Sequence, residues 1–388
     1  MAAVGERRRC LKAIVILSAL TCSVWDCSIA FLQGQPDKMP ETVLVTGGSG
    51  YVGSHCVREL LERGYDVRAT VRSKTSKSAE FLTKEKLAPS STGTLTLFEA
   101  DLLKDGSFDE AVAGCNHVLH VASPFLIGSP ADPQKELIDP ALQGTKTLLN
   151  SVNKDGNVKT VVLTSSVVAM YDSPADAANK PGHMMDENDW NEKSTLKDSP
   201  YPLSKTLAEK EAWKMAEGAS WKLTTINPGL VLGPTLSGRA NDGTFAFLDG
   251  LLKGNYKVMP ALMFGMVDVR DIAKAHVEAF ERKEASGRYC CVANSFWARE
   301  LSDMVRERYP NAKGVNATLP SALVRVLAML RVLPKGFGKS AGAEIRFNNN
   351  KAKTELGIDF MDVKQTIWDT VDSMVDMGLV TGLTKPDA

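Results

Sequence analysis

Tyr201 and Lys205 are the two side chains of this sequence whose types and spacing most directly suggest proton chemistry. They stand four residues apart at the start of a predicted helix, where Pro202 is well tolerated because the first turn needs no N–H from it. Residues four apart lie one turn apart on the same helix face. We predict that the Lys205 ammonium lowers the pKa of Tyr201 from about 10, because a nearby cation favours a phenolate. Tyr201 would then donate a proton to a carbonyl oxygen.

The same spacing occurs at Tyr309 and Lys313, so spacing alone does not identify a site. Pro310 directly follows the second tyrosine, and we predict that this segment is a turn that ends a helix. Tyr201 instead follows the most apolar strand of the chain, predicted over 158–164. The carboxyl end of such a strand is the edge where an open α/β sheet carries its functional groups.

Ser165 and Ser166 stand at that strand end, after Thr164. A serine in such a place more often caps a turn than binds a substrate. The helix with Tyr201 should pack beside this edge, however, and a motif gains weight when its structural context agrees. We therefore predict that this pair belongs to the same site.

Residues 46–53 form a glycine-rich turn between the apolar run 43–45 and a predicted helix. The turn has the G-x-G-x-x-G spacing of dinucleotide-binding proteins, in which glycines allow a tight turn and a close approach to a pyrophosphate. The N–H groups of the following helix then hold the anion. An ordinary glycine-rich turn is the alternative. We expect the cofactor to contact Thr46, Gly47, Gly48, Ser49, Gly50, Tyr51, Val52 and Gly53.

The end of the second predicted strand selects the dinucleotide. A carboxylate there would bind the ribose hydroxyl of NAD, whereas an arginine would accommodate the 2′-phosphate of NADP. The sequence has Arg72, Lys74 and Lys77, and no acidic residue follows until Glu80. A solvated basic loop is the alternative, but its place beside the glycine turn favours NADP(H), with Arg72 as the main contact.

Strands and helices alternate from Thr42 onward, which predicts an α/β fold, a doubly wound parallel sheet. The sheet would place its ligand beyond the carboxyl ends of its strands. We expect a helix from about Tyr51 to Arg63, ended by Gly64 in a left-handed cap. The strands are expected at 43–45, 67–71, 95–99, 118–121, 158–164 and 223–226, with further helices at about 135–150 and 202–217.

The pattern becomes irregular after about residue 235. We therefore divide the chain into a leader (1–30), a linker (31–41), a dinucleotide-binding core (42–234) and a mixed region (235–388) with returning strands and helices that covers the substrate. Residues 318–333 are apolar, with Arg325 and Arg331 spaced among them. This spacing predicts an amphipathic surface helix.

The ordered motifs resemble those of the extended short-chain dehydrogenase/reductase family. They are Thr46-Gly47-x-x-Gly50-x-x-Gly53, Asp101-Leu102, Thr164-Ser165-Ser166, Tyr201-x-x-x-Lys205 and Asn227-Pro228-Gly229. The stretches Glu62–Arg72 and Ser204–Glu209 are similar to the branch of dihydroflavonol 4-reductases, cinnamoyl-CoA reductases and aldehyde or ketone reductases. The resemblance covers residues 42 to about 379.

This resemblance implies a role for each matching residue. Ser166 would hydrogen-bond the substrate carbonyl, Tyr201 would donate the proton, and Lys205 would hold the nicotinamide ribose and lower the tyrosine pKa. The hydride would come from the nicotinamide. Further cofactor contacts are implied at Asp101, Leu102, Val121, Ala122, Ser123, Pro228, Gly229, Leu230 and Val231.

Three departures bear on cofactor and substrate. Related reductases often place a lysine six positions after the arginine, whereas Lys77 stands five after Arg72. Dihydroflavonol reductases usually have asparagine where this chain has Tyr171. Cinnamoyl-CoA reductases carry Trp-Tyr-Cys-Tyr where this chain has Ser199–Pro202. The expectation is therefore an NADPH-dependent reductase of a small-molecule carbonyl substrate, an aldehyde or ketone.

Two other functions remain as alternatives. A nucleotide-sugar epimerase or dehydratase on the same scaffold would retain NAD, which the basic residues around Arg72 disfavour. A non-catalytic dinucleotide-binding protein would have no need of Ser166, Tyr201 and Lys205 together. We expect no metal site, and the sequence leaves the oligomeric state open.

The amino-acid composition limits the kinds of partner that we expect this chain to bind. The 388 residues include 46 Lys plus Arg and 46 Asp plus Glu, and this balance argues against a nucleic-acid surface. Cys56, Cys115, Cys290 and Cys291 form no C-x-x-C pair in the body of the chain, so we predict small buried thiols of a reducing compartment.

Residues 1–30 have the layout of a secretory-type signal, with a basic start, an apolar stretch from Ala13 to Trp25 and small residues before Phe31. The junction of Ala30 and Phe31 also resembles plastid-targeting leaders of algae with complex plastids. The endoplasmic reticulum or a retained membrane anchor are alternatives. The apolar stretch is shorter than the roughly 20 residues of a spanning helix, so no span is expected in the mature chain.

Overall fold

The computed structural model describes residues 41–123, 130–238, 243–333, 335–380 and 382–385, which belong to one compact unit beginning at Glu41. The predicted leader (1–30) and all but the last residue of the linker lie outside the described residues. Among the described residues, none of the helices has the length and apolar character needed to cross a bilayer.

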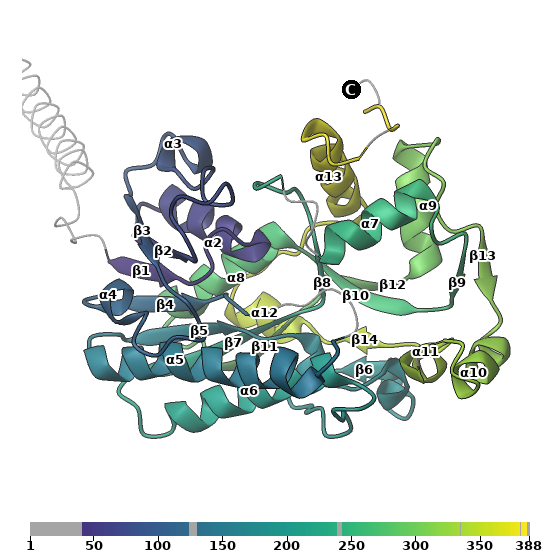
Figure 1. The fold of residues 1–388 in the computed structure, drawn as a ribbon, viewed down its shortest axis with the longest axis horizontal. Coiled ribbons are helices and arrows are strands. Elements are labelled where there is room, and N and C mark those ends of the chain that lie inside the picture. The colour runs from purple at the N-terminus through teal and green to yellow at the C-terminus, as the bar shows by residue number, and fades with distance from the viewer. Residues whose placement is uncertain (1–40, 124–129, 239–242, 334, 381, 386–388) are drawn as a thin grey trace, which may run out of the picture. The chain divides into compact units, whose positions relative to one another are not determined.

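A parallel sheet of seven described strands forms the centre of the unit (Figure 1), as the alternating pattern predicted. Its order is β11-β7-β5-β4-β1-β2-β3, and every neighbouring pair is parallel. The strands are β1 (Thr42–Val45), β2 (Asp66–Val71), β3 (Leu95–Glu99), β4 (His117–His120), β5 (Thr160–Thr164), β7 (Lys222–Pro228) and β11 (Gly287–Cys291).

Helices cover both faces of the sheet, because consecutive apolar residues of a strand point to opposite sides. Val43 and Val45 pack under α2 (Tyr51–Glu62) and α8 (Val269–Glu281), whereas Leu44 packs under α5 (Asp139–Asp155) and α6 (Pro200–Ala216). α2 lies beside α8 and α5 beside α6 (Figure 1). The shorter helices are α3 (Lys84–Leu87), α4 (Asp109–Val112) and α12 (Asn350–Glu355), and a π-helical turn, Gln134–Ile138, precedes α5.

The predicted cap after α2 is present. Gly64 has a φ of 82°, in the left-handed region that glycine favours. The N–H of Gly64 donates to Leu61 O at 2.9 Å, and that of Tyr65 donates to Leu60 O at 3.1 Å. These bonds satisfy carbonyls at the end of the helix and turn the chain into β2.

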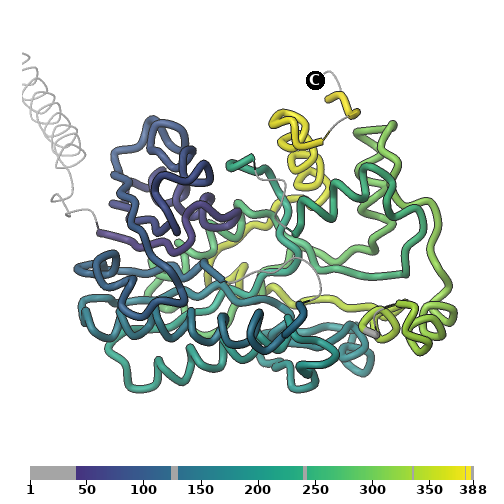
Figure 2. Tube along the Cα trace, in the orientation of Figure 1, coloured from purple at the N-terminus to yellow at the C-terminus, as the bar shows by residue number. Residues whose placement is uncertain are grey.

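The region after residue 229 builds a second, smaller core around a three-stranded sheet in the order β12-β10-β8. α7, α9 and α13 pack their apolar faces on it, and the yellow C-terminal helix α13 lies against α9 (Figure 2). The bounds are β8 (Leu230–Leu232), α7 (Gly243–Lys253), β9 (Val258–Pro260), β10 (Met263–Asp268), β12 (Asn294–Trp297), α9 (Ala298–Arg308), β13 (Ala317–Leu319) and α13 (Val363–Asp376).

The helix predicted over 318–333 is present but shorter, and its apolar residues do not all face the protein. α10 (Ser321–Met329) buries Val324 and Ala328, whereas Met329 is 75% and Val332 67% exposed. α11 (Lys335–Ser340) lies beside it. The short strands β6 (Met184–Met185) and β14 (Arg346–Phe347) form a parallel pair. α10 is therefore a surface helix that buries one side, as the amphipathic pattern predicted.

The four body cysteines are buried free thiols, as predicted: Cys56, Cys115, Cys290 and Cys291. Burial raises the pKa of each, so all four are protonated at neutral pH. They behave as small apolar side chains of the core.

Candidate active site

The site lies where the strand order reverses, between β1 and β4. The chain leaves β1 toward β2 on one side and leaves β4 toward β5 on the other. An open α/β sheet has a crevice beyond the carboxyl ends of its strands at such a point. The glycine turn follows β1 and residues 121–123 follow β4, so both predicted cofactor segments meet there. The N–H of Thr46 donates to Leu119 O at 3.0 Å and joins them.

Glycine is required by the geometry of the turn at two positions. Gly47 has a φ of 67°, and a Cβ there would lie 3.0 Å from the Ala122 Cβ. A Cβ on Gly53 would lie 2.3 Å from Gly47 O, which is far inside van der Waals contact. These contacts show the tight turn and the close packing that the glycine spacing predicted.

Two threonines brace this turn from inside the sheet. Thr46 Oγ1 accepts from the N–H of Val121 at 3.1 Å and of Ala122 at 2.9 Å. Its own proton is then directed to His120 Nδ1, 3.0 Å away. Burial and the nearby Lys205 ammonium lower the pKa of His120 to about 3, so the ring is neutral. The Thr70 hydroxyl accepts from the N–H of Gly47 at 3.2 Å.

The N-terminus of α2 suits an anion. Gly50 is the N-cap and has no side chain, and the first helical turn carries no acidic residue. The positive end of the helix dipole therefore faces the crevice without a competing carboxylate. Ser49 precedes the cap and Val52 lies in the first turn. Tyr51 turns its hydroxyl to Gly233 O at 2.7 Å, which ties the turn to the chain after β8.

Arg72 follows the last residue of β2 and its side chain is exposed, as is that of Lys77. One carboxylate lies near the end of β2: Glu99 on β3 pairs with Val71, the residue before Arg72. Glu99 accepts the Lys74 N–H at 2.8 Å, so it is engaged with the loop backbone. An exposed cation at the end of β2 fits a 2′-phosphate, which agrees with the NADP(H) predicted from the sequence.

Asp101 and Leu102 follow β3 on the same edge of the sheet. Asp101 is exposed, and its Oδ1 accepts the N–H of Leu103 at 2.9 Å, which fixes the turn. Leu102 lies against Gly144 of α5, where a Cβ would lie 3.1 Å from the Leu102 Cβ. The pair is therefore placed beside the crevice, as an adenine-binding segment would be.

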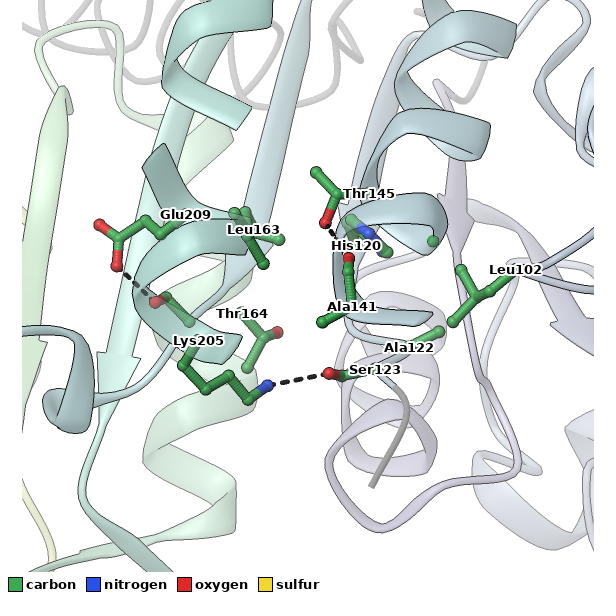
Figure 3. A pocket seen from close by; sticks show the side chains of 13 residues that line it. Leu102, His120, Ala122, Ser123, Ala141, Thr145, Leu163, Thr164, Lys205 and Glu209 are labelled. Atoms are coloured by element: carbon green, nitrogen blue, oxygen red, sulfur yellow. Dashed lines mark hydrogen bonds between the residues drawn. The ribbon is translucent and has the colours of Figure 1, made fainter. Parts of the chain in front are cut away.

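Lys205 crosses from α6 to the end of β4. Its Nζ donates to Ser123 Oγ at 3.0 Å (Figure 3). A cavity of about 20 Å³ lies behind this contact, lined by side chains that include His120, Thr145 and Leu102. Such a volume holds about one water molecule. Burial lowers the pKa of Lys205 to about 8.

The predicted direction of the tyrosine pKa is wrong in this structure. Burial raises the pKa of Tyr201 to about 12 rather than lowering it. The low-dielectric surroundings of the buried phenol disfavour the charged phenolate. The phenol is therefore held in its protonated form at neutral pH, which is the form that a proton donor needs.

The two serines after β5 have different environments, although they are adjacent in sequence. Ser165 is buried and donates to the Glu209 carboxylate, behind the sheet edge. Ser166 is half-buried and caps the 3-10 turn Val167–Ala169, with its Oγ accepting the N–H of Val168 at 3.3 Å. That turn contacts α6, so Ser166 lies on the element next to Tyr201. Ser166 thus both caps a turn and borders the site.

Residues 228–231 connect the large sheet to the small one. Pro228 ends β7, and Leu230 and Val231 belong to β8. A Cβ on Gly229 would lie 2.3 Å from Gly265 O, so glycine allows the two sheets to approach here. Within the described ranges, no cluster of three or more His, Cys, Asp or Glu side chains is arranged to hold a metal ion.

The family model of the NAD dependent epimerase/dehydratase family matches residues 43–291, from β1 to the last strand of the large sheet. The chain belongs to this family. This membership confirms the resemblance that the ordered motifs indicated. The matched segment contains the whole glycine turn and the Tyr201–Lys205 motif, and within the described residues all seven strands of the large sheet.

Curated relatives match this chain over nearly their whole length. The cinnamoyl-CoA reductase CAD2 of Medicago truncatula is 38% identical over 86% of this chain and 95% of its own. The tetraketide alpha-pyrone reductase 1 of Arabidopsis thaliana is 34% identical over 89% of this chain and 98% of its own. Gre2 of Candida albicans in complex with NADPH is a similar solved structure, with a TM-score of 0.70 and 30% identity over 87% of this chain and 99% of that one.

Proposed function

We propose that this chain is an NADPH-dependent reductase that transfers hydride to the carbonyl of a small aldehyde or ketone. The observation that carries the proposal is the 3.0 Å contact between Lys205 and Ser123. It brings the helix with the proton donor to the crevice beside the glycine turn. The named relatives are reductases, and one similar solved structure is an NADPH complex.

The residues present fit this cofactor. The glycine turn and the N-terminus of α2 would hold the pyrophosphate, Arg72 the 2′-phosphate, and Lys205 with Ser123 the ribose next to the nicotinamide. When bound, NADPH supplies the hydride that reduces the carbonyl carbon.

The protein supplies orientation and the proton. Ser166 Oγ donates a hydrogen bond to the carbonyl oxygen, which polarises the bond and fixes its direction. Tyr201 gives its phenolic proton to that oxygen, so that the carbonyl becomes an alcohol. The Lys205 ammonium stabilises the phenolate that remains on Tyr201. Because burial keeps Tyr201 protonated, the site is set for reduction at neutral pH.

A substrate screen tests this function. We expect the purified chain to oxidise NADPH, followed by its absorbance, with members of a panel of small aldehydes and ketones, and to use NADH much less well. A protein that oxidises NADPH with no carbonyl of the panel, or that carries tightly bound NAD without net turnover, would contradict the proposal. The second result is the one expected of an epimerase on this scaffold.

Within residues 235–388, the second core forms the substrate-binding side of the enzyme in this proposal, whereas β11 belongs to the large sheet and α8 packs on it. β8 and β10 join that region to the end of β7, next to the site. Exchange of the segment 294–380 with that of a relative should change the preferred carbonyl substrate while leaving the preference for NADPH unchanged. A change of cofactor preference alone would contradict this division of the chain.

We also propose that the leader, residues 1–30, targets the protein. Its basic start, apolar stretch and small residues support a secretory-type signal within a plastid-targeting leader. Imaging of residues 1–41 fused to a fluorescent protein in an alga with complex plastids tests it. Fluorescence confined to the endoplasmic reticulum or to a membrane would support one of the alternatives.

A further inference from the structure

Glu209 lies on α6 one helical turn beyond Lys205, and it was not among the expected site residues. Its carboxylate is fully buried, with 0% of the side chain exposed, and is paired with Arg288, which is 6% exposed. Arg288 Nε donates to Glu209 Oε1 at 2.6 Å. Arg288 belongs to β11, so the pair links the catalytic helix to the far edge of the large sheet.

The remaining acceptor sites of the Glu209 carboxylate are filled from two neighbouring strand ends. Ser165, next to Ser166, donates its hydroxyl proton to it. Asn227 Nδ2 donates to Glu209 Oε2 at 2.9 Å and also to Ser166 O at 3.2 Å. With Thr225 Oγ1 at 3.2 Å and Trp213 Nε1 at 3.4 Å, five donor side chains converge on this carboxylate.

The arginine of this pair extends the connection to the segment that precedes α6. Its guanidinium stacks 3.9 Å from the centre of the Trp190 ring. It donates to the carbonyls of Glu187 at 3.0 Å and of Ala169 at 3.4 Å. Ala169 is the last residue of the turn that Ser166 caps. One ion pair thus holds α6, the end of β5 and the segment before Tyr201 in a fixed relation.

We propose that Glu209 is a positioning residue for the proposed reductase site, which aligns Ser166 with Tyr201 and Lys205 through its buried pair with Arg288. This inference rests on the proposed function. A buried charge without its partner is strongly unfavourable, so the pair can be satisfied only when all these elements are in place. The carboxylate also acts on Lys205, because its negative charge opposes the lowering of the lysine pKa by burial.

The charged and titratable groups that face Lys205 come from three elements. Tyr201 and Glu209 lie on its own helix, His120 faces it from β4, and Arg288 stands behind Glu209 on β11. Burial and the Lys205 ammonium lower the pKa of His120 to about 3, so its ring is neutral at working pH. Glu209 is therefore the group whose replacement should change the protonation of Lys205.

The test compares Glu209→Gln with Asp372→Asn. Asp372 is also a carboxylate paired with an arginine, Arg308, at 2.8 Å, but it is half-buried and lies between α9 and α13 in the second core. For Glu209→Gln we expect kcat to fall by about tenfold to a hundredfold, since small misplacements at a reacting centre have effects of this size. NADPH affinity should fall much less, because the phosphates are held elsewhere.

The pH profile separates positioning from mere loss of stability. In Glu209→Gln the alkaline decline of kcat should move to lower pH, since the charge that keeps Lys205 protonated is gone. Glu209→Asp keeps the charge and should retain the wild-type decline, although kcat falls. Asp372→Asn should lower Tm and leave both kcat and its pH profile unchanged.

If Glu209→Gln does not fold, the double variant Glu209→Gln/Arg288→Met removes both charges and leaves no unpaired ion. A double variant, or a Glu209→Gln enzyme, with wild-type kcat and wild-type pH profile would overturn the inference. Failure of the proposed function is recognised separately, because the wild-type chain would then oxidise no NADPH and Tyr201→Phe would change nothing.

Discussion

Two segments of this chain share the spacing Tyr-x-x-x-Lys, and their structures differ completely. Tyr201 and Lys205 lie on one face of the first turns of α6, next to the crevice of the large sheet. Tyr309 stands after the last residue of α9, with φ −121° and ψ 78°, so the chain has already left the helix. Lys313 is exposed and packs against Gly254.

Each tyrosine also has a different partner. Tyr309 donates its hydroxyl proton to Asp372 at 2.7 Å, and that carboxylate together with burial raises its pKa. Tyr309 therefore serves the packing between α9 and α13. The comparison shows that spacing places two side chains together only when both residues are helical. Of the two pairs, the first lies at the edge of the large sheet, where Lys205 reaches Ser123.

The largest difference should appear when the two hydroxyls are removed. Tyr201→Phe removes the proton donor, and we expect kcat to fall by at least about a hundredfold, as for other general acids. Tyr309→Phe should lower Tm and leave kcat unchanged, since its hydroxyl bonds Asp372 in the second core. Steady-state kinetics and thermal unfolding of both variants test this. Equal activity of the two variants would remove the distinction between the segments.

The next largest effect concerns the cofactor side of the first segment. Arg72→Glu replaces a cation by a carboxylate at the proposed 2′-phosphate site, where a charged hydrogen bond contributes about 1.5–3 kcal/mol. We expect the KM for NADPH to rise roughly tenfold or more, with little change for NADH. Lys313→Ala is the control, because Lys313 is exposed and packs against Gly254, and it should change either KM by less than about twofold. Equal effects of Arg72→Glu on both cofactors would exclude this contact.

A pH profile distinguishes the two lysines. The pKa of Lys205 is lowered to about 8, so the ammonium is present below pH 8 and is lost as the pH rises above it. Reduction should therefore decline on the alkaline side with an apparent pKa near 8. Lys313 is exposed, and Lys313→Met should leave this decline unchanged. A flat profile up to pH 10 would contradict the role of Lys205.

The smallest effect is on stability in acid. Burial lowers the pKa of His276 to about 4, below its ordinary value of 6.5. The unfolded chain therefore binds a proton that the folded chain does not between these values, and stability is lost as the pH falls from about 6.5 toward 4. His276→Gln should flatten this part of the curve of unfolding free energy against pH. Its Nε2 lies 2.6 Å from Thr164 Oγ1, so some stability at neutral pH is lost as well.

The fold could be predicted because its main determinants are local sequence patterns. Apolar strands such as 43–45, glycines such as Gly64 and the order of motifs specified a doubly wound sheet, and the family model confirms it. The boundaries of strands β4 and β5 differ from the predicted ones by one or two residues. The choice of residues 309–313 as a turn was also correct, because Pro310 excludes a continuing helix.

The features that the sequence did not predict are those that depend on contacts between distant segments. Glu209 pairs with Arg288, which is 79 residues away, and no local pattern announces such a pair. The neutral His120 under Thr46 is hidden for the same reason. The direction of the Tyr201 pKa was missed because burial depends on everything packed around the phenol, not on the neighbour four residues away.

β11 is the last strand of the large sheet in chain order, and it follows α7 of the second core. The large sheet is therefore completed only after part of the second core has been synthesised. A growing chain that has reached residue 234 has β7 with an unpaired edge, and an exposed edge is a template for wrong pairing. At this stage of synthesis Arg288 is not yet part of the chain, so Glu209 lacks the partner of its buried ion pair. The cofactor half is therefore not a module that can be cut off or transplanted at residue 234. Any fusion, truncation or recombination has to keep residues 287–291 in the same polypeptide as the glycine turn.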